Sequence, residues 1–159
     1  MAYWLTIELE LGEIAPLPAA MDTQSEGLVY GTTVPQILTQ LDRIGHKLGI
    51  DKLDNFIYKD TTGFRRLLDE AESEGNAVLA SAMRAEIATV ADRPRWHEPS
   101  QARQTVRSLK EFVATNQDTL PGKDPQATAK WTLWDLEAYD LILSDLEERG
   151  LKFAFVERN

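Results

Sequence analysis

The sequence predicts an α+β fold that is predominantly helical and carries a small antiparallel sheet. Apolar and polar residues alternate at both ends of the chain, which is the period of a half-buried strand. Between these ends, apolar residues recur every three or four positions, which is the period of an amphipathic helix. A length of 159 residues favours one domain, so we expect a single α+β domain over residues 1–159.

The first and last segments are expected to be strands that pair with each other. Residues 3–11 alternate between an apolar face and a polar face, which predicts one solvated side. Residues 151–156 alternate in the same way, with Phe153 and Phe155 on the apolar face. Neither strand has another obvious partner, and unpaired edges are prone to aggregation, so the N- and C-terminal strands should share a sheet. Residues 15–26 should form a loop, and residues 28–30 are a candidate short strand.

The clearest helix begins at Thr33, which has the spacing of a capping box with Gln36. Apolar residues over 34–48 form one stripe at helical spacing, and Gly49 can adopt the left-handed conformation that ends a helix. His46 falls in the last turn, where a histidine interacts favourably with the carbonyl end of the helix. We therefore expect a structural role for His46.

The rest of the middle is predicted to be mostly helical, because capping residues, prolines and glycines bound several periodic segments. In chain order we expect a helix start at Asp60 or Thr61, a break at Gly75-Asn76, an alanine-rich helix over 77–90, a start near Pro99 or Ser100, a loop over 116–123, and a long helix from Asp124-Pro125 to Arg149-Gly150.

The composition limits the classes of function. The net charge is −9, from 17 basic and 26 acidic residues, and such a charge repels phosphate backbones, so no nucleic-acid partner is expected. The absence of cysteine excludes disulfides and thiolate metal sites. The start of the chain lacks the basic residues of a signal peptide, and no window reaches the roughly 20 apolar residues of a membrane helix. We therefore expect a cytoplasmic protein with no membrane partner.

Acidic residues are concentrated in two segments. The first basic residue is Arg43, so the opening segment carries only acids, and a second acidic block runs over residues 135–148. This distribution suggests an acidic docking face for a basic protein partner, with Trp4, Glu8 and Glu10 as the candidate contact residues. A well-solvated surface is the alternative explanation.

A candidate ligand site combines the proline-bounded loop at 93–99 with the helix that follows it. His97 and Glu98 lie on the loop and are expected to face water, while Arg103 and Arg107 share one helix face. These side chains could together bind a phosphate or a carboxylate. Alternatively, the arginines pair with the acidic helix of the same molecule, and His97 and Glu98 are only solvated neighbours of a packed tryptophan.

Asp135 falls on the apolar face of the long helix, among Trp131, Ile142 and Leu146. A carboxylate there could be a buried acid with a shifted pKa, which is a signal of a functional site. Residues 132–135 also have the spacing of a capping box. Asp135 could therefore instead cap a helix that starts late, or form an internal ion pair.

No motif in the sequence specifies a reaction. Gly27 and Gly31 lack the spacing of a phosphate-binding loop, no Gly-x-Ser-x-Gly elbow is present, and the two histidines stand apart. Catalytic residues therefore stay unknown, and neither a cofactor nor a metal is expected. We favour a non-enzymatic protein interaction module, an adaptor or inhibitor, over a small enzyme or anionic-ligand binder and over a structural homodimer subunit.

Overall fold

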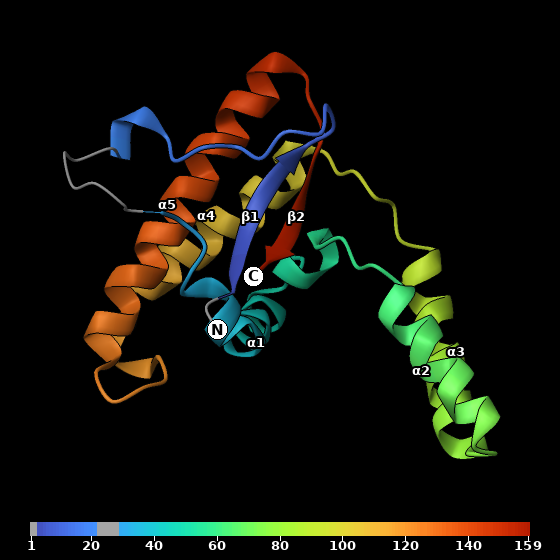
Figure 1. Cartoon of the computed structure of the whole chain (residues 1–159). Coiled ribbons are helices and arrows are strands. Elements are labelled where there is room, and N and C mark those ends of the chain that lie inside the picture. The colour runs from blue at the N-terminus through green and yellow to red at the C-terminus, as the bar shows by residue number, and fades with distance from the viewer. Residues whose placement is uncertain (1–2, 22–28) are drawn as a thin grey trace. The chain divides into compact units, whose positions relative to one another are not determined.

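The computed structural model describes residues 3–21 and 29–159 (Figure 1). The chain divides into two compact units, one formed by Met1–Ile57 together with Trp96–Asn159 and the other by Tyr58–Arg95. The assignment of the whole chain to one domain stays a prediction. The larger unit contains the sheet and the candidate sites, and the smaller unit is a pair of helices.

The segment between the first strand and the first long helix is mostly irregular. Residues 22–28 lie outside the described residues, so the expected loop over 15–26 and the candidate strand over 28–30 are only partly covered. Within the described part, Ala19–Met21 forms a 3₁₀ turn, and residues 29–30 lie outside any strand.

β1 (Trp4–Leu9) and β2 (Phe153–Arg158) form a two-stranded antiparallel sheet, which confirms the predicted pairing of the terminal strands. Ile7 lies opposite Phe155, and both side chains are fully buried on the face that meets the core. Figure 1 shows the two strands running alongside each other, with N- and C-terminal segments of the chain brought together. The chain is therefore closed by contacts between residues more than 140 positions apart.

The opposite face of the sheet differs from the prediction of a solvated side. Thr6 lies opposite Val156 on this face, and both are buried, as is Ala154. Glu8 is half-buried opposite Ala154. The alternation of the sequence identified which residues share a face, but it did not show that this second face is also covered at its centre.

Both edges of the sheet are engaged by irregular segments of the larger unit. Three backbone amides of β1 donate to neighbouring oxygens, namely Leu5 to the Gly31 carbonyl (2.8 Å), Ile7 to the Tyr30 hydroxyl (3.3 Å) and Leu9 to the Glu13 carbonyl (2.8 Å). Along β2, Phe153 exchanges two backbone hydrogen bonds with His97 (2.8 and 3.1 Å). These bonds occupy edge groups that could otherwise pair with a strand of another chain.

α1 (Leu38–Leu48) follows a 3₁₀ turn, Val34–Ile37, and the two together cover the predicted first helix. Thr33 makes no side-chain capping bond, so the predicted capping box with Gln36 is wrong. The end of the helix agrees with the prediction, because Gly49 adopts the left-handed conformation with φ of 70°.

α4 (Pro99–Thr115) and α5 (Pro125–Arg149) pack along each other, and their buried faces form one hydrophobic core with the sheet. Both helices begin where the prolines predicted. The Asp124 carboxylate caps α5 by accepting the Ala127 amide (3.1 Å), and Gly150 ends it in the left-handed conformation. Among the described residues, no helix has the length and apolar character needed to span a membrane.

The smaller unit, Tyr58–Arg95, contains α2 (Thr62–Ser73) and α3 (Ala77–Ala91), in agreement with the predicted helices. The Asp60 carboxylate accepts the first backbone amide of α2 (2.9 Å). Asn76 caps α3 by accepting a backbone amide from its first turn (3.1 Å). Local capping chemistry therefore defines the starts of both helices.

Candidate functional site

Asp135 lies on the buried face of α5, with 1% of the residue exposed. Its carboxylate accepts backbone amides from Gly31 (2.7 Å), Thr33 (2.8 Å) and Val34 (2.9 Å). Burial raises the pKa of Asp135, and the hydrogen bonds from these amides partly offset that rise. The burial predicted from the sequence is confirmed. α5 begins at Pro125, ten residues before Asp135. Residues 132–135 therefore do not cap the start of a helix, and that alternative is wrong.

The basic face of α4 is paired with acidic residues of α5. The ion pairs join Arg103 to Asp140 (3.2 Å) and Glu147 (2.8 Å), Arg107 to Asp140 (3.2 Å), and Lys110 to Glu137 and Asp140 (3.4 Å to the latter). Burial alone would raise the pKa of Asp140, but hydrogen bonds from Arg103 and Arg107 outweigh it and lower the pKa. The intramolecular pairing considered in the sequence analysis is therefore present. Anion binding by Arg103 and Arg107 stays a prediction, and an anion there would compete with Asp140.

His97 is packed into the larger unit rather than projecting from a loop. Its ring meets the Phe56 ring edge-on, with centroids 5.3 Å apart, and its side chain is half-buried. The expectation that His97 faces water is therefore wrong, because the loop is bonded to β2 through Phe153. Glu98 is exposed, as expected, and its carboxylate lies 3.8 Å from the Lys152 ammonium. A ligand-binding role for His97 and Glu98 stays a prediction.

The candidate partner-binding residues lie near the ends of β1. Trp4 and Glu8 are half-buried on the strand. Glu10 follows the strand and is exposed, and its carboxylate accepts the Lys152 backbone amide (2.9 Å). Glu10 therefore helps to hold the two ends of the sheet together. Docking of a basic protein on Trp4, Glu8 and Glu10 stays a prediction.

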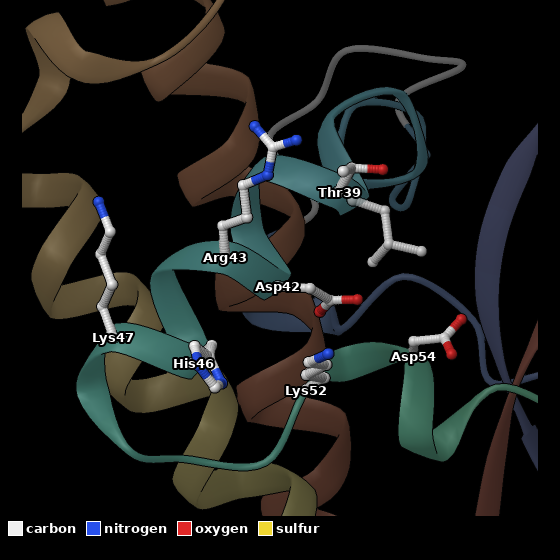
Figure 2. Close-up of a pocket in the computed structure, with 8 residues that line it drawn as sticks. Thr39, Asp42, Arg43, His46, Lys47, Lys52 and Asp54 are labelled. Atoms are coloured by element: carbon white, nitrogen blue, oxygen red, sulfur yellow. The ribbon is translucent and has the colours of Figure 1, made fainter.

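A pocket of about 570 Å³ lies beside α1 and the 3₁₀ turn Leu53–Phe56 that follows it (Figure 2). The side chains that line it are Leu38, Thr39, Asp42, Arg43, His46, Lys47, Lys52 and Asp54. Those on α1 repeat at the three- to four-residue spacing of one helix face. Figure 2 shows Arg43 and Lys47 toward one side of the view and Asp54 toward the other.

The two carboxylates of this pocket are already engaged. Asp42 accepts the Leu53 backbone amide (3.0 Å). Burial raises the pKa of Asp42, the negative charge of Asp54 adds to the rise, and the Leu53 bond and the Lys52 charge oppose it. Asp54 also has an interaction partner. The acidic side of the pocket is therefore partly satisfied by the protein itself.

The basic side chains of the pocket differ from those of α4. Arg43, Lys47 and Lys52 are exposed, and they form no ion pair with any residue that the structure describes. His46 also lines the pocket. Three basic side chains thus line one pocket, beside the carboxylates of Asp42 and Asp54, in a protein whose net charge is −9.

This cluster was missed because the sequence analysis interpreted His46 by its position in the last turn of a helix. The position is confirmed, but the same turn also faces the pocket. A usable signal was the spacing of Arg43 and Lys47, which are one turn apart, with Lys52 shortly beyond the left-handed Gly49 that turns the chain back. The turn at Gly49 brings residues 52–54 next to the face of α1 that lines the pocket.

Comparison with family models, with curated proteins and with solved structures finds no match for this chain. Within residues 3–21 and 29–159, no group of three or more histidine, aspartate and glutamate side chains is placed to hold a metal ion.

Proposed function

We propose that the protein is a non-enzymatic binding module that accepts an anionic group, a phosphate or a carboxylate, in the α1 pocket. One observation carries the proposal: Arg43, Lys47 and Lys52 line the same pocket without an internal ion pair among the described residues. Guanidinium and ammonium groups are the usual partners of phosphate and carboxylate oxygens. This ligand class is one that the sequence analysis considered for the Arg103 and Arg107 region.

Three basic side chains, Arg43, Lys47 and Lys52, line the pocket against two carboxylates, Asp42 and Asp54. The Asp42 carboxylate already accepts the Leu53 amide, and Lys52 lies close enough to Asp42 to lower its pKa. Figure 2 shows the Arg43 and Lys47 side chains extending from α1 on the side of the view opposite Asp54, with their charged ends apart from each other. A bound anion would therefore pair with basic side chains of the lining that form no ion pair among the described residues.

The contrast with α4 supports the choice of pocket. An anion at Arg103 would have to displace Asp140 and Glu147, which lie at 3.2 and 2.8 Å from its guanidinium. An anion at Arg43 and Lys47 displaces only water and counter-ions. The net charge of −9 opposes both sites at long range, but that repulsion is screened beyond roughly 10 Å at ordinary salt.

The test is a thermal-shift titration with inorganic phosphate and with citrate at constant ionic strength. Both probes should stabilise the wild-type protein, because a ligand that binds only the folded state raises the melting temperature. The double variant R43Q/K47Q should lose that response. The double variant R66Q/K123Q removes the same charge from exposed positions outside the pocket and should keep it. No shift in the wild type, or an equal shift in both variants, would refute the assignment.

The other functional expectations stay predictions. An acidic docking face for a basic protein, the absence of nucleic-acid binding, a homodimer and a cytoplasmic location each need direct measurement. The structure uses several acids internally, since Asp140 and Glu147 pair with Arg103 and Glu10 bonds the Lys152 backbone. Less acidic surface is therefore available for docking than the composition suggests.

A further inference from the structure

A second pocket, of about 370 Å³, lies where the start of α1 approaches the start of α5. Three separate segments of the larger unit contribute to it. Its lining residues are Thr33, Gln36, Ile37, Gln40, Pro121, Gly122, Ala127, Thr128 and Trp131. The volume falls within the roughly 300–1,000 Å³ range of small-molecule sites.

This lining contains no ionisable side chain, although 27% of the residues in the chain are charged. The α1 pocket, in contrast, is lined mainly by charged groups. A charge-free lining offers nothing to pair with an ion. The second pocket therefore suits a neutral ligand.

Trp131 provides a large aromatic surface at this pocket. The residue is 42% exposed, which leaves much of its surface accessible to a ligand. The Lys130 ammonium lies 5.2 Å from the centroid of the indole, and the Trp134 ring meets it at 72° with centroids 6.4 Å apart. A ligand that packs on the indole would therefore share this aromatic surface with the Lys130 ammonium and the Trp134 ring.

Hydrogen-bonding groups accompany the indole. Gln36 lies in the 3₁₀ turn Val34–Ile37 and Gln40 in the first turn of α1. The Gln36 side-chain amide donates to the Thr32 carbonyl (2.8 Å), which leaves its side-chain oxygen as an acceptor. Among the described residues no partner engages the Gln40 carboxamide, so it retains both donors and its acceptor. The Thr128 hydroxyl donates to the Asp124 carbonyl (3.3 Å) and keeps its lone pairs.

The walls of the pocket are fixed by the fold. The Thr33 backbone amide is held by the buried Asp135 carboxylate at 2.8 Å. Gly122 has φ of 111°, and a Cβ built on it would lie 3.0 Å from the Thr128 hydroxyl oxygen, so the 121–122 turn packs closely on α5. Two parts of the lining, Thr33 and the 121–122 turn, are therefore held in place by contacts within the fold.

We infer that this second pocket binds a neutral, hydroxyl-rich ligand, namely a sugar ring of an oligosaccharide. The C–H face of a pyranose packs on an indole, and its hydroxyls exchange hydrogen bonds with carboxamide and hydroxyl side chains. This combination matches Trp131, Gln36 and Gln40, and it requires no charge. The inference is independent of the anion proposed for the α1 pocket, because the two sites share no lining residue.

The test titrates the full-length protein with maltotriose, cellotriose and N,N′,N″-triacetylchitotriose, each up to about 10 mM, a range that covers the weak affinities of small ligands. Tryptophan fluorescence and the side-chain amide resonances of Gln36 and Gln40 report binding. At least one probe should give a saturable response. The variants W131A and Q40A should each weaken it by about tenfold or more, because each removes a direct contact, while Q104A, an exposed glutamine outside the pocket, should leave it unchanged.

Three results would overturn the inference. The first is the lack of a saturable response to all three sugars. The second is binding that W131A and Q40A leave unchanged although circular dichroism shows both variants folded. The third is binding of a proline-rich peptide that depends on Trp131 when no sugar binds, because the pocket would then recognise a peptide.

Discussion

The Gly31 backbone amide donates a 2.7 Å hydrogen bond to the carboxylate of Asp135, 104 residues further along the chain. The Gly31 carbonyl in turn accepts the Leu5 amide of β1 (2.8 Å). The Tyr139 hydroxyl, one turn after Asp135, donates to the Leu5 carbonyl (2.7 Å). Gly31 thus links the long helix to the first strand, and the turn that follows it supplies Thr33 to the second pocket.

Replacement of Asp135 by alanine should destabilise the protein strongly. The variant leaves three buried or partly buried amides without their acceptor, and each unsatisfied group costs about 1–3 kcal/mol. We expect the free energy of unfolding, measured with urea, to fall by about 3 kcal/mol or more. D135N should lower the free energy of unfolding by a smaller amount. The asparagine keeps one acceptor oxygen, but its NH₂ group faces a backbone amide that is itself a donor. The control D118N, at an exposed position, should change the free energy of unfolding little. If D135A lowers it no more than D118N does, Asp135 does not hold the fold through these amides.

The stability of the protein should also depend on pH through Asp135. Burial raises the pKa of Asp135 in the folded state above its ordinary value of 3.8, so the folded protein holds this proton more tightly than the unfolded chain. This contribution is most favourable below the ordinary pKa and declines as the pH rises through the raised value. The difference in unfolding free energy between wild type and D135N should therefore shrink as the pH rises above the ordinary pKa of 3.8. If the difference between wild type and D135N instead grows as the pH rises, the pKa of Asp135 is not raised in the folded state.

Gly31 should not tolerate a side chain. Its φ is 86°, and a Cβ at this position would lie 2.0 Å from the Leu5 carbonyl oxygen, which is backbone and cannot rotate away. We expect G31A to lower the melting temperature sharply or to prevent folding. The matched control is G63A, because Gly63 lies within α2 with no heavy atom near the position of a Cβ. G63A should be neutral or stabilising, since alanine favours helix by up to about 1 kcal/mol over glycine. Similar melting temperatures for G31A and G63A would show that the Leu5 backbone does not pack this closely on Gly31.

The C-terminal strand should be essential for folding. Phe155 is fully buried, and its ring lies 4.9 Å from the ring of Tyr139 between centroids. F155A should cost about 3–5 kcal/mol of unfolding free energy, as for other buried phenylalanines. Deletion of residues 151–159 should abolish the cooperative melting transition seen by calorimetry. A truncated protein that melts cooperatively at the wild-type temperature would contradict the pairing of the chain ends.

Much of the fold could be predicted from local sequence patterns. Alternating residues identified both strands, and Asp124-Pro125, Gly49 and Gly150 marked helix ends, because these features depend on neighbours in the chain. The capping box at Thr33 failed for the opposite reason. The Thr33 amide is taken by Asp135, and no local spacing encodes a contact between residues 102 positions apart.

The candidate site was harder to predict than the fold. Helical spacing correctly placed Arg103 and Arg107 on one face of the helix. It does not determine that both arginines form ion pairs with Asp140 of another helix. Arg43 and Lys47 show an equivalent spacing in the sequence. What distinguishes them is that they form no ion pair with the described residues, which depends on the three-dimensional packing around α1.

The most direct test of the proposed function is a ¹H–¹⁵N correlation titration of the wild-type protein with inorganic phosphate at constant ionic strength. The account predicts saturable shifts that cluster in residues 38–54, including the Leu53 amide that donates to Asp42, and that disappear in R43Q/K47Q. Shifts that instead cluster at residues 97–107 and disappear in R103Q/R107Q would place the anion on α4. That result, or the absence of saturable shifts, would contradict the account.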